Sequence, residues 1–396
     1  MSFPVQSTPR FPSDIAIAGV GATRQAKHLE ETTLSACLQA ARAALADAGI
    51  DKSQVDGVAG RWPGPGGTVL EPGSLDWATL LGIPVRWVDD SYPQGVPGAL
   101  AAAAAVSAGL CDTVLILGGQ AGGLGTAGNP VATYTRPENE FVAPYGSFTA
   151  AQFALVAQVY AHRHRPAPEG MAQIAATIRN MGHFNPDAVM AGRGPYTARD
   201  VLDSPLVAEP LHLLELCLAN EGAVALVVTT LERARAGPKA PIRLLGGGAE
   251  WRRQQYVEPP RYDEVWALGT DAARRMWAQS GLRPSDVDVA QLYDANSWEV
   301  IRQLEAFGFC REGEGLDYAL EIGLGLDGAL PTNTDGGLLS FSALGWAGTS
   351  LKIVEAVRQL RGEGGDRQVG GAEVAIASGA GSGAQYSNVL LLGRDR

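Results

Sequence analysis

The pattern of apolar and polar positions predicts strands that alternate with helices along the whole chain. Nearly continuous apolar runs such as "DIAIAGVGAT" (14–23), "TVLILGG" (113–119) and "GAVALVVTT" (222–230) are typical of strands buried on both faces. The alanine-rich stretch before "TVLILGG" predicts a buried helix. We therefore expect an α/β protein with mostly parallel sheets, covered by helices on both faces.

Two stretches of the sequence repeat one another. Residues 41–60 and 273–292 each read as a helix that ends at a glycine, followed by a polar turn and a strand. Each copy also follows strand-like sequence, "DIAIAGVGAT" in one case and "PIRLLGGGAE" in the other. The identities in the ungapped alignment are Ala41/Ala273, Arg42/Arg274, Ala46/Ala278, Gly49/Gly281, Ser53/Ser285, Val55/Val287 and Asp56/Asp288.

The repeat predicts two related halves. The first half spans residues 1–236 and the second spans residues 242–396, with "ARAGPKAP" at the junction as the linker. The first half carries an additional stretch, at about residues 120–215. An insertion of this size commonly forms a lid or a wall of the substrate site.

Composition and charge exclude several classes of protein. The 396 residues carry a net charge of −11, which argues against nucleic acid as a partner because phosphate binding needs clustered Lys and Arg. The four cysteines form no CxxC pair, and four thiols suit a reducing, cytoplasmic location. The start of the sequence lacks the pattern of a signal peptide. A membrane span over 96–119 is disfavoured because alanine is only weakly apolar.

Cofactor and metal signals are weak. Gly123-Leu-Gly125-Thr-Ala-Gly128 matches GxGxxG, but loop-like sequence follows where a dinucleotide site needs a helix. His162 and His164 stand two apart on a predicted helix and so point to different faces. We expect no metal and no cofactor.

Polar residues and glycines follow the predicted strands of the second half. Tyr293, Asp294 and Asn296 stand where a strand meets its turn, which is where open α/β sheets place ligands. Gly336 and Gly337 would let the backbone approach a ligand, and Gly381 and Gly383 would offer N–H groups to a carbonyl oxygen. The alternatives are a capped strand end, with Asp294 starting the next helix, and close packing of strand against helix.

The stretch "VDDSYPQGVPGALAAAAAVSAG" (88–109) is a strand-to-helix turn of the kind that can hold a nucleophile beside free N–H groups. Here the turn offers only Ser91 and Tyr92.

At these residues the sequence resembles the thiolase superfamily, in particular the sterol-carrier-protein-x type. "AARAALADAGIDKSQVDGV", "EPLHLLELCLANEGAVALVV" and "PTNTDGGLLS" match that family in order and spacing, and the likeness covers nearly the whole chain. The resemblance implies the thiolase fold, in which two similar halves form a five-layered αβαβα arrangement. It also implies a homodimer.

The residues that carry thiolase chemistry do not match. Tyr92-Pro93-Gln94-Gly95 lies where the family has its nucleophilic cysteine, and Ser342-Ala343-Leu344 replaces the Gly-His-Pro motif. Ala377 or Ser378 replaces the C-terminal acid/base cysteine. The resemblance therefore implies a scaffold without thiolase activity.

The chain is most similar to the cysteine-lacking, thiolase-like aldolases of steroid side-chain breakdown. That resemblance implies retro-aldol cleavage of a β-hydroxyacyl-CoA to propionyl-CoA or acetyl-CoA and a ketone or aldehyde, with a small OB-fold, acyl-CoA-associated partner protein. For this chemistry we expect Tyr293 to transfer a proton or to donate to the oxyanion, and Asp294 to position the turn. The expected substrate contacts are at Asn296, Gly336, Gly337, Ser342, Gly381 and Gly383. A second tyrosine is expected where this chain has Ala343, so Tyr92 or Ser91 is the candidate second polar group.

Two alternatives stay open. Ser91 could act as the nucleophile of an acyltransferase, although no histidine base is evident for it. The protein could also be a non-catalytic subunit that binds an acyl-CoA or another lipid.

Overall fold

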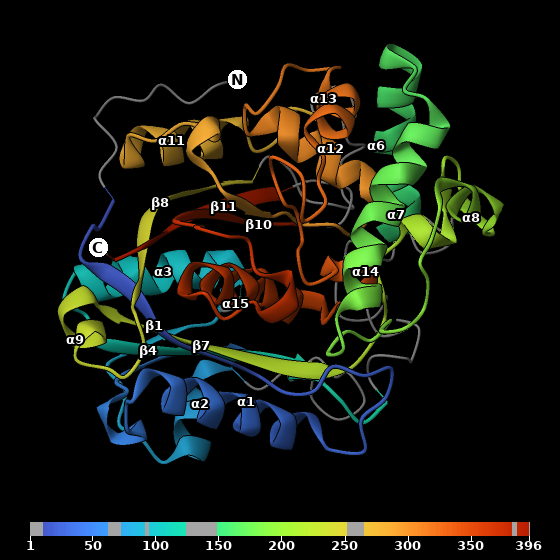
Figure 1. Ribbon diagram of the computed structural model, residues 1–396. Coiled ribbons are helices and arrows are strands. Elements are labelled where there is room, and N and C mark those ends of the chain that lie inside the picture. The colour runs from blue at the N-terminus through green and yellow to red at the C-terminus, as the bar shows by residue number, and fades with distance from the viewer. Residues whose placement is uncertain are drawn as a thin grey trace.

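The computed structural model describes residues 11–61, 73–91, 95–123, 149–251, 265–381 and 386–395. Helices and strands stack in five layers, α-β-α-β-α, as Figure 1 shows. The strands are β1 (Ile15–Ala22), β2 (Gly57–Arg61), β3 (Trp87–Asp89), β4 (Thr113–Gln120), β5 (Leu206–Ala208), β6 (Leu211–His212), β7 (Gly222–Thr230), β8 (Ile242–Trp251), β9 (Val289–Gln291), β10 (Val374–Ala380) and β11 (Tyr386–Arg394). The helices are α1 (Thr33–Ala48), α2 (Ser74–Leu81), α3 (Gly95–Ser107), α6 (Thr149–His164), α7 (Pro168–Phe184), α8 (Ala198–Asp203), α9 (Leu231–Arg235), α11 (Thr270–Ser280), α12 (Ser297–Ala306), α13 (Gly315–Ile322), α14 (Gly337–Ser340) and α15 (Gly348–Arg361).

The two sheet layers are joined into one strand order, β3-β2-β4-β7-β1-β8-β11-β10-β9. The join between β1 and β8 consists of only two residue pairs, Ala16 with Arg243 and Ile17 with Ile242. On one side of this join the order is β1-β7-β4-β2, and on the other it is β8-β11-β10-β9. The expected thiolase arrangement of two similar α/β halves is therefore confirmed.

The prediction of mostly parallel sheets is wrong. Parallel pairing joins β2 to β3 and β4, and β9 to β10, whereas β1, β7, β8 and β11 pair with all their neighbours antiparallel. Continuous apolar runs indicate parallel strands because parallel sheets are usually buried on both faces. Here helices cover both faces of a mixed sheet, and that burial produces the same sequence pattern.

The sequence repeat becomes a structural repeat. Helices α1 and α11 both end at a glycine in the left-handed region, Gly49 at φ +66° and Gly281 at φ +71°. Both helices also lie unusually close to the strand before them. A Cβ atom at Gly21 would lie 2.4 Å from a carbonyl oxygen of α1, and one at Gly248 would lie 2.5 Å from a carbonyl oxygen of α11.

Helices α3 and α15 form the central layer, one from each half, and each packs against strands of both sheets (Figure 1). The buried alanines of α3 (Ala99, Ala102, Ala103 and Ala105) and the aliphatic residues of α15 belong to one buried core. The expected buried helix before the strand at 113–120 is confirmed as α3. Within the described residues, no helix combines the length and apolar character needed to cross a membrane.

The described part of the predicted insertion, residues 149–215, is mainly helical. Helix α7 packs against α12, α13 and α14 of the second half, and α8 packs against α7. Residues 124–148 lie outside the described residues. The insertion's role as a lid and the boundary between the halves at 236–242 stay predictions.

Candidate active site

Tyr293 lies two residues beyond the end of β9, at the edge where β9 and β10 end. Its backbone N–H donates to Ser378 Oγ at 2.9 Å, and its carbonyl oxygen accepts from Gln303 Nε2 at 2.6 Å. Ser378 Oγ in turn donates to Gln303 Oε1 at 2.5 Å. The three residues close a ring of hydrogen bonds that fixes the backbone of the tyrosine, so its phenol is held on a rigid support.

The Tyr293 side chain is half-buried, and burial raises the pKa of its phenol well above the usual value of 10. Negative charge at Tyr386, Cys217, Glu299 and Asp294 raises that pKa further, in that order. The phenol is therefore neutral over the physiological range. In that state it donates a proton or a hydrogen bond rather than accepting one.

Asp294 is fully buried and its carboxylate is occupied by protein groups. Oδ1 accepts from Lys352 Nζ at 2.6 Å and from the Leu338 N–H at 3.0 Å, and Oδ2 accepts from the Leu339 N–H at 3.3 Å. The carboxylate thus holds the first turn of α14 and the start of the central helix α15. This geometry makes Asp294 a positioning residue, and a contact with substrate stays untested.

Asn296, rather than Asp294, begins the next helix. Its Oδ1 accepts from the Glu299 N–H at 3.0 Å and caps α12, so the alternative that Asp294 starts this helix is wrong. The Nδ2 atom of Asn296 is buried and has no hydrogen-bond partner among the residues that the structure describes. The predicted substrate contact of Asn296 stays a prediction.

Gly336 and Gly337 approach protein atoms. A Cβ at Gly336 would lie 2.5 Å from the Gly182 Cα, and one at Gly337 would lie 2.1 Å from Asp294 Oδ2. Both also have positive φ, +108° and +59°, which favours glycine. The structure therefore supports the packing alternative for both glycines, and their predicted contact with substrate stays untested.

Ser342 is buried inside a polar cluster. Its Oγ donates to Gln25 Oε1 at 2.7 Å and accepts from Asn220 Nδ2 at 2.9 Å. Asn220 Oδ1 accepts from the Ala343 N–H at 2.7 Å. These bonds fix the segment that replaces the family's histidine motif. The Ser342 hydroxyl already acts as a donor to Gln25 and as an acceptor from Asn220. Its predicted contact with substrate stays a prediction.

The glycine turn after β10 is only partly described. The Gly381 N–H donates to the Tyr386 carbonyl oxygen at 3.3 Å, so it is engaged in the β10–β11 hairpin rather than free for a thioester oxygen. The predicted contact of Gly381 with substrate stays a prediction. Gly383 lies outside the described residues.

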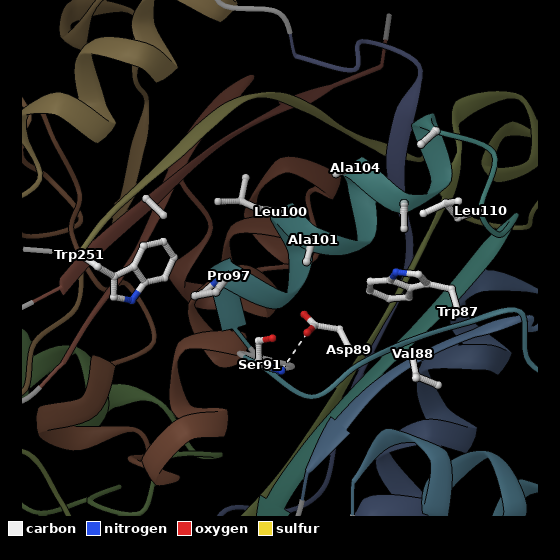
Figure 2. Close-up of a pocket in the computed structure, with 13 residues that line it drawn as sticks. Trp87, Val88, Asp89, Ser91, Pro97, Leu100, Ala101, Ala104, Leu110 and Trp251 are labelled. Atoms are coloured by element: carbon white, nitrogen blue, oxygen red, sulfur yellow. Dashed lines mark hydrogen bonds between the residues drawn. The ribbon is translucent and has the colours of Figure 1, made fainter. Parts of the chain in front are cut away.

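Ser91 lies in an apolar groove of about 740 Å³ that runs along α3 (Figure 2). Its N–H donates to Asp89 Oδ1 at 2.9 Å, which closes the turn after β3. The groove is lined by Trp87, Val88, Asp89, Ser91, Pro97, Leu100, Ala101, Ala104, Ala105, Ala108, Leu110, Ala249 and Trp251. All five histidines lie within the described residues, and none lines this groove. Tyr92, the neighbouring candidate, lies outside the described residues.

The four cysteines are poor nucleophiles. Burial raises the pKa of the thiols of Cys37, Cys111 and Cys310 to about 12. Cys217 is near Tyr293, and burial together with the charge of Asp294 raises the pKa of its thiol to about 11. The thiolate is the reactive form of cysteine, so none of the four is activated near neutral pH.

The structure adds residues that the sequence pattern did not single out. Gln303 and Lys352 support Tyr293 and Asp294, and Tyr386 lies against Gly381 at the same edge of the sheet. Lys352 carries a signal that could have been used, because it is a charged residue among the small and apolar residues of "TSLKIVEAV" (349–357). Among the described residues, no group of three His, Cys, Asp or Glu side chains is placed to hold a metal ion.

Comparisons with known proteins agree with this architecture. A family model described as "Thiolase C-terminal domain-like" matches residues 263–394. The 17-hydroxy-3-oxo-4-pregnene-20-carboxyl-CoA lyase of Mycobacterium tuberculosis is 33% identical over 92% of this chain and 96% of its own. The steroid side-chain-cleaving aldolase of Thermomonospora curvata is 32% identical over 98% of this chain and 99% of its own.

Solved structures extend the likeness to three dimensions. The structure of an Ltp2-ChsH2(DUF35) aldolase matches with a TM-score of 0.82 and 31% identity, over 98% of this chain and 99% of that one. Human mitochondrial 3-ketoacyl-CoA thiolase shares the fold at a TM-score of 0.70 and 14% identity. The likeness to both groups, with full-length identity above 30% to the lyase and the aldolase, shows that this chain belongs to the thiolase superfamily, in the branch of the thiolase-like steroid side-chain aldolases.

Proposed function

We propose that this protein is a carbon–carbon lyase that cleaves a β-hydroxyacyl-CoA by retro-aldol chemistry. The substrate is the CoA thioester of a steroid side chain or a related branched acid, and the products are propionyl-CoA or acetyl-CoA and a ketone or aldehyde. One observation carries the proposal: a neutral phenol, Tyr293, is held rigidly at the strand edge of a thiolase fold whose cysteines are all inert. The names of the two similar full-length relatives support the same reaction.

The reaction needs proton transfer and no covalent intermediate. A base removes the proton of the β-hydroxyl, the bond between the α and β carbons breaks, and its electron pair moves into the thioester as an enolate. The β carbon becomes the carbonyl of the ketone or aldehyde. The neutral Tyr293 phenol then donates its proton to the α carbon, or first stabilises the enolate oxygen by a hydrogen bond. Asp294 and Lys352 act by keeping the strand-end turn in place.

The test is an assay with a panel of short, branched and steroid-derived β-hydroxyacyl-CoA esters, with acyl-CoA release followed by mass spectrometry. Release of propionyl-CoA or acetyl-CoA without a covalent adduct is the expected result. Binding of the esters without release would favour the non-catalytic binding subunit. A mass increase at Ser91 would favour the acyltransferase.

The assay includes a partner protein. The matched aldolase structure contains ChsH2(DUF35) together with Ltp2. By analogy we assign this chain a small OB-fold partner that associates with the acyl-CoA. A partner gene encoded nearby should therefore be co-expressed. Cleavage that is as fast without the partner as with it would remove this part of the proposal.

The homodimer is a further part of the proposal. Among the described strands, β3 pairs only with β2, so its outer edge lies at the end of the sheet. The groove beside it presents small apolar side chains of α3, including the exposed Ala104 (Figure 2). A second copy would cover this edge, as sheet edges usually require. Light scattering should give twice the chain mass, and Ala104→Asp should reduce it to one chain.

The CoA thioester is the only small molecule that the proposed reaction requires. We therefore expect full cleavage after exhaustive dialysis against a chelator, and loss of activity that a divalent cation restores would contradict this. The four reduced thiols suit the cytoplasm. Cell fractionation tests that assignment.

A further inference from the structure

The retro-aldol reaction leaves one catalytic position open in this chain. Cleavage moves two protons, one away from the β-hydroxyl oxygen and one to the α carbon of the enolate. The Tyr293 phenol is neutral and suits the second step. The family resemblance places a second tyrosine where this chain has Ala343. The methyl side chain of alanine can neither accept nor donate a proton. The base for the first step therefore has to come from another element.

Tyr386 is a second tyrosine at the same edge of the sheet. It is the first residue of β11, and its ring lies on Gly381: a Cβ at Gly381 would lie 1.8 Å from Tyr386 Cε1. Strand β11 pairs with β10, and β10 pairs with β9, which Tyr293 follows. The Tyr293 N–H donates to Ser378 Oγ on β10, and Gly381 is the first residue after that strand. The two tyrosines therefore lie at the same edge of the sheet, one after β9 and one at the start of β11, with β10 between these strands.

Tyr386 is close enough to Tyr293 to affect the pKa of its phenol. After burial, negative charge on Tyr386 is the largest contribution that raises the pKa of Tyr293. Both side chains are half-buried. Tyr386 also pairs in register with Trp251, and their rings stack with centroids 6.4 Å apart. Trp251 lines the groove that holds Ser91, so Tyr386 stacks on a residue of that groove.

We propose that Tyr386 is the second catalytic tyrosine of the site and takes the proton of the β-hydroxyl group. This inference rests on the proposed retro-aldol function and adds the residue that completes it. The other described tyrosines are less suitable. Tyr160 is buried with its hydroxyl donating to Glu305 Oε1 at 2.7 Å, Tyr196 packs near Arg179, and Tyr318 lies on α13.

These two tyrosines account for both proton transfers of the reaction. The Tyr386 phenolate accepts the β-hydroxyl proton as the carbon–carbon bond breaks. The Tyr293 phenol gives its proton to the α carbon of the enolate and becomes a phenolate. A proton then returns from Tyr386 to Tyr293. Only one phenolate exists at a time, because two nearby phenolates repel one another.

The first experiment compares Tyr386→Phe with Tyr318→Phe in the full-length protein with its partner. We expect Tyr386→Phe to lower kcat by 10²-fold or more, with the KM for the β-hydroxyacyl-CoA changed by less than threefold. Tyr318→Phe, which removes a hydroxyl from a half-buried tyrosine outside the site, should leave kcat within twofold. Near-normal kcat in Tyr386→Phe would overturn the inference, as would a large loss confined to Tyr92→Phe.

The pH profile separates a catalytic role from a structural one. A fluorinated tyrosine placed at position 386 has a more acidic phenol. It should move the ascending limb of kcat/KM to lower pH, and Tyr386→Phe should abolish that limb. An unchanged ascending limb would overturn the inference even if Tyr386→Phe were inactive through misfolding.

If the wild-type protein cleaves no ester of the panel, the proposed function itself fails. If the wild-type protein and Tyr386→Phe both cleave the ester at the same rate, the proposed function stands. Only the catalytic role of Tyr386 is then contradicted.

Discussion

Lys352 Nζ lies 2.6 Å from Asp294 Oδ1, and solvent reaches neither side chain. This ion pair joins the central helix α15 to the turn that carries Tyr293. The same carboxylate accepts two N–H groups at the start of α14. Three elements of the second half are therefore tied together at one buried carboxylate, directly beside the candidate catalytic tyrosine.

Removal of the cation should destabilise the fold strongly. Lys352→Met leaves the Asp294 carboxylate buried without its charged partner, and breaking a buried pair costs about 3–5 kcal/mol. The measurement is chemical denaturation. The control is Lys239→Met, which breaks a pair of the same 2.6 Å length with Glu363 at a largely exposed site, where less than about 1 kcal/mol is expected. Equal losses in the two variants would contradict the assigned role of Asp294.

Removal of the Tyr293 hydroxyl should stop cleavage without weakening binding. Tyr293→Phe keeps the backbone bonds to Ser378 and Gln303, so the turn should keep its shape. We expect kcat to fall by about 10²–10⁴-fold, the usual range for a proton-transfer group, with binding of the CoA ester unchanged. The measurements are steady-state kinetics and calorimetric binding. Full activity in Tyr293→Phe would refute the role of this phenol.

Thiol reagents should not inhibit the enzyme near neutral pH. The pKa of the Cys217 thiol is raised to about 11, so the reactive thiolate is scarce at pH 7.5. We expect iodoacetamide at this pH to leave both the activity and the intact mass unchanged, whereas protein unfolded in denaturant should be alkylated quickly. Rapid labelling of native Cys217, with loss of activity, would show that a cysteine takes part after all.

Asp335 should make stability depend on pH in the acid range. Burial and the charge of Glu355 raise the pKa of this carboxyl from 3.8 to about 6. Between these values the folded protein binds more protons than the unfolded chain. The contribution of Asp335 is therefore fully present below about pH 4 and is lost as the pH rises through about 6.

The variant Asp335→Asn tests this dependence. Its amide oxygen can still accept the Gly337 N–H that Oδ1 accepts at 2.8 Å in the native protein. Relative to wild type, the Tm of Asp335→Asn should be clearly higher at pH 8 than at pH 4. A Tm difference that is the same at both pH values would show that the pKa of Asp335 is not raised in the folded state.

The sequence predicted the architecture better than the site. Strand and helix positions, the buried α3 and the repeat closed by Gly49 and Gly281 follow from local patterns, which depend on residues close in the chain. Strand direction did not follow, because burial on both faces gives the same apolar run in parallel and antiparallel strands.

The site was only partly predictable because its contacts cross long stretches of sequence. Tyr293 was found from its position at a strand end. Its support by Ser378, 85 residues away, and the pairing of Asp294 with Lys352, 58 residues away, depend on tertiary packing. Glycines are ambiguous for the same reason. The sequence around Gly337 predicts space for a ligand, but in the fold the buried carboxylate of Asp294 occupies that space.

The central layer has a consequence for how the chain can be divided. Helix α3 comes from the first half and α15 from the second, yet each is covered by both sheets. Either half produced alone would expose the apolar face that its missing counterpart covers. A cut in the exposed linker at 237–240 should therefore yield two fragments that are insoluble separately but reassemble when they are expressed together. The two halves repeat one another in sequence, but they fold together as one cooperative unit.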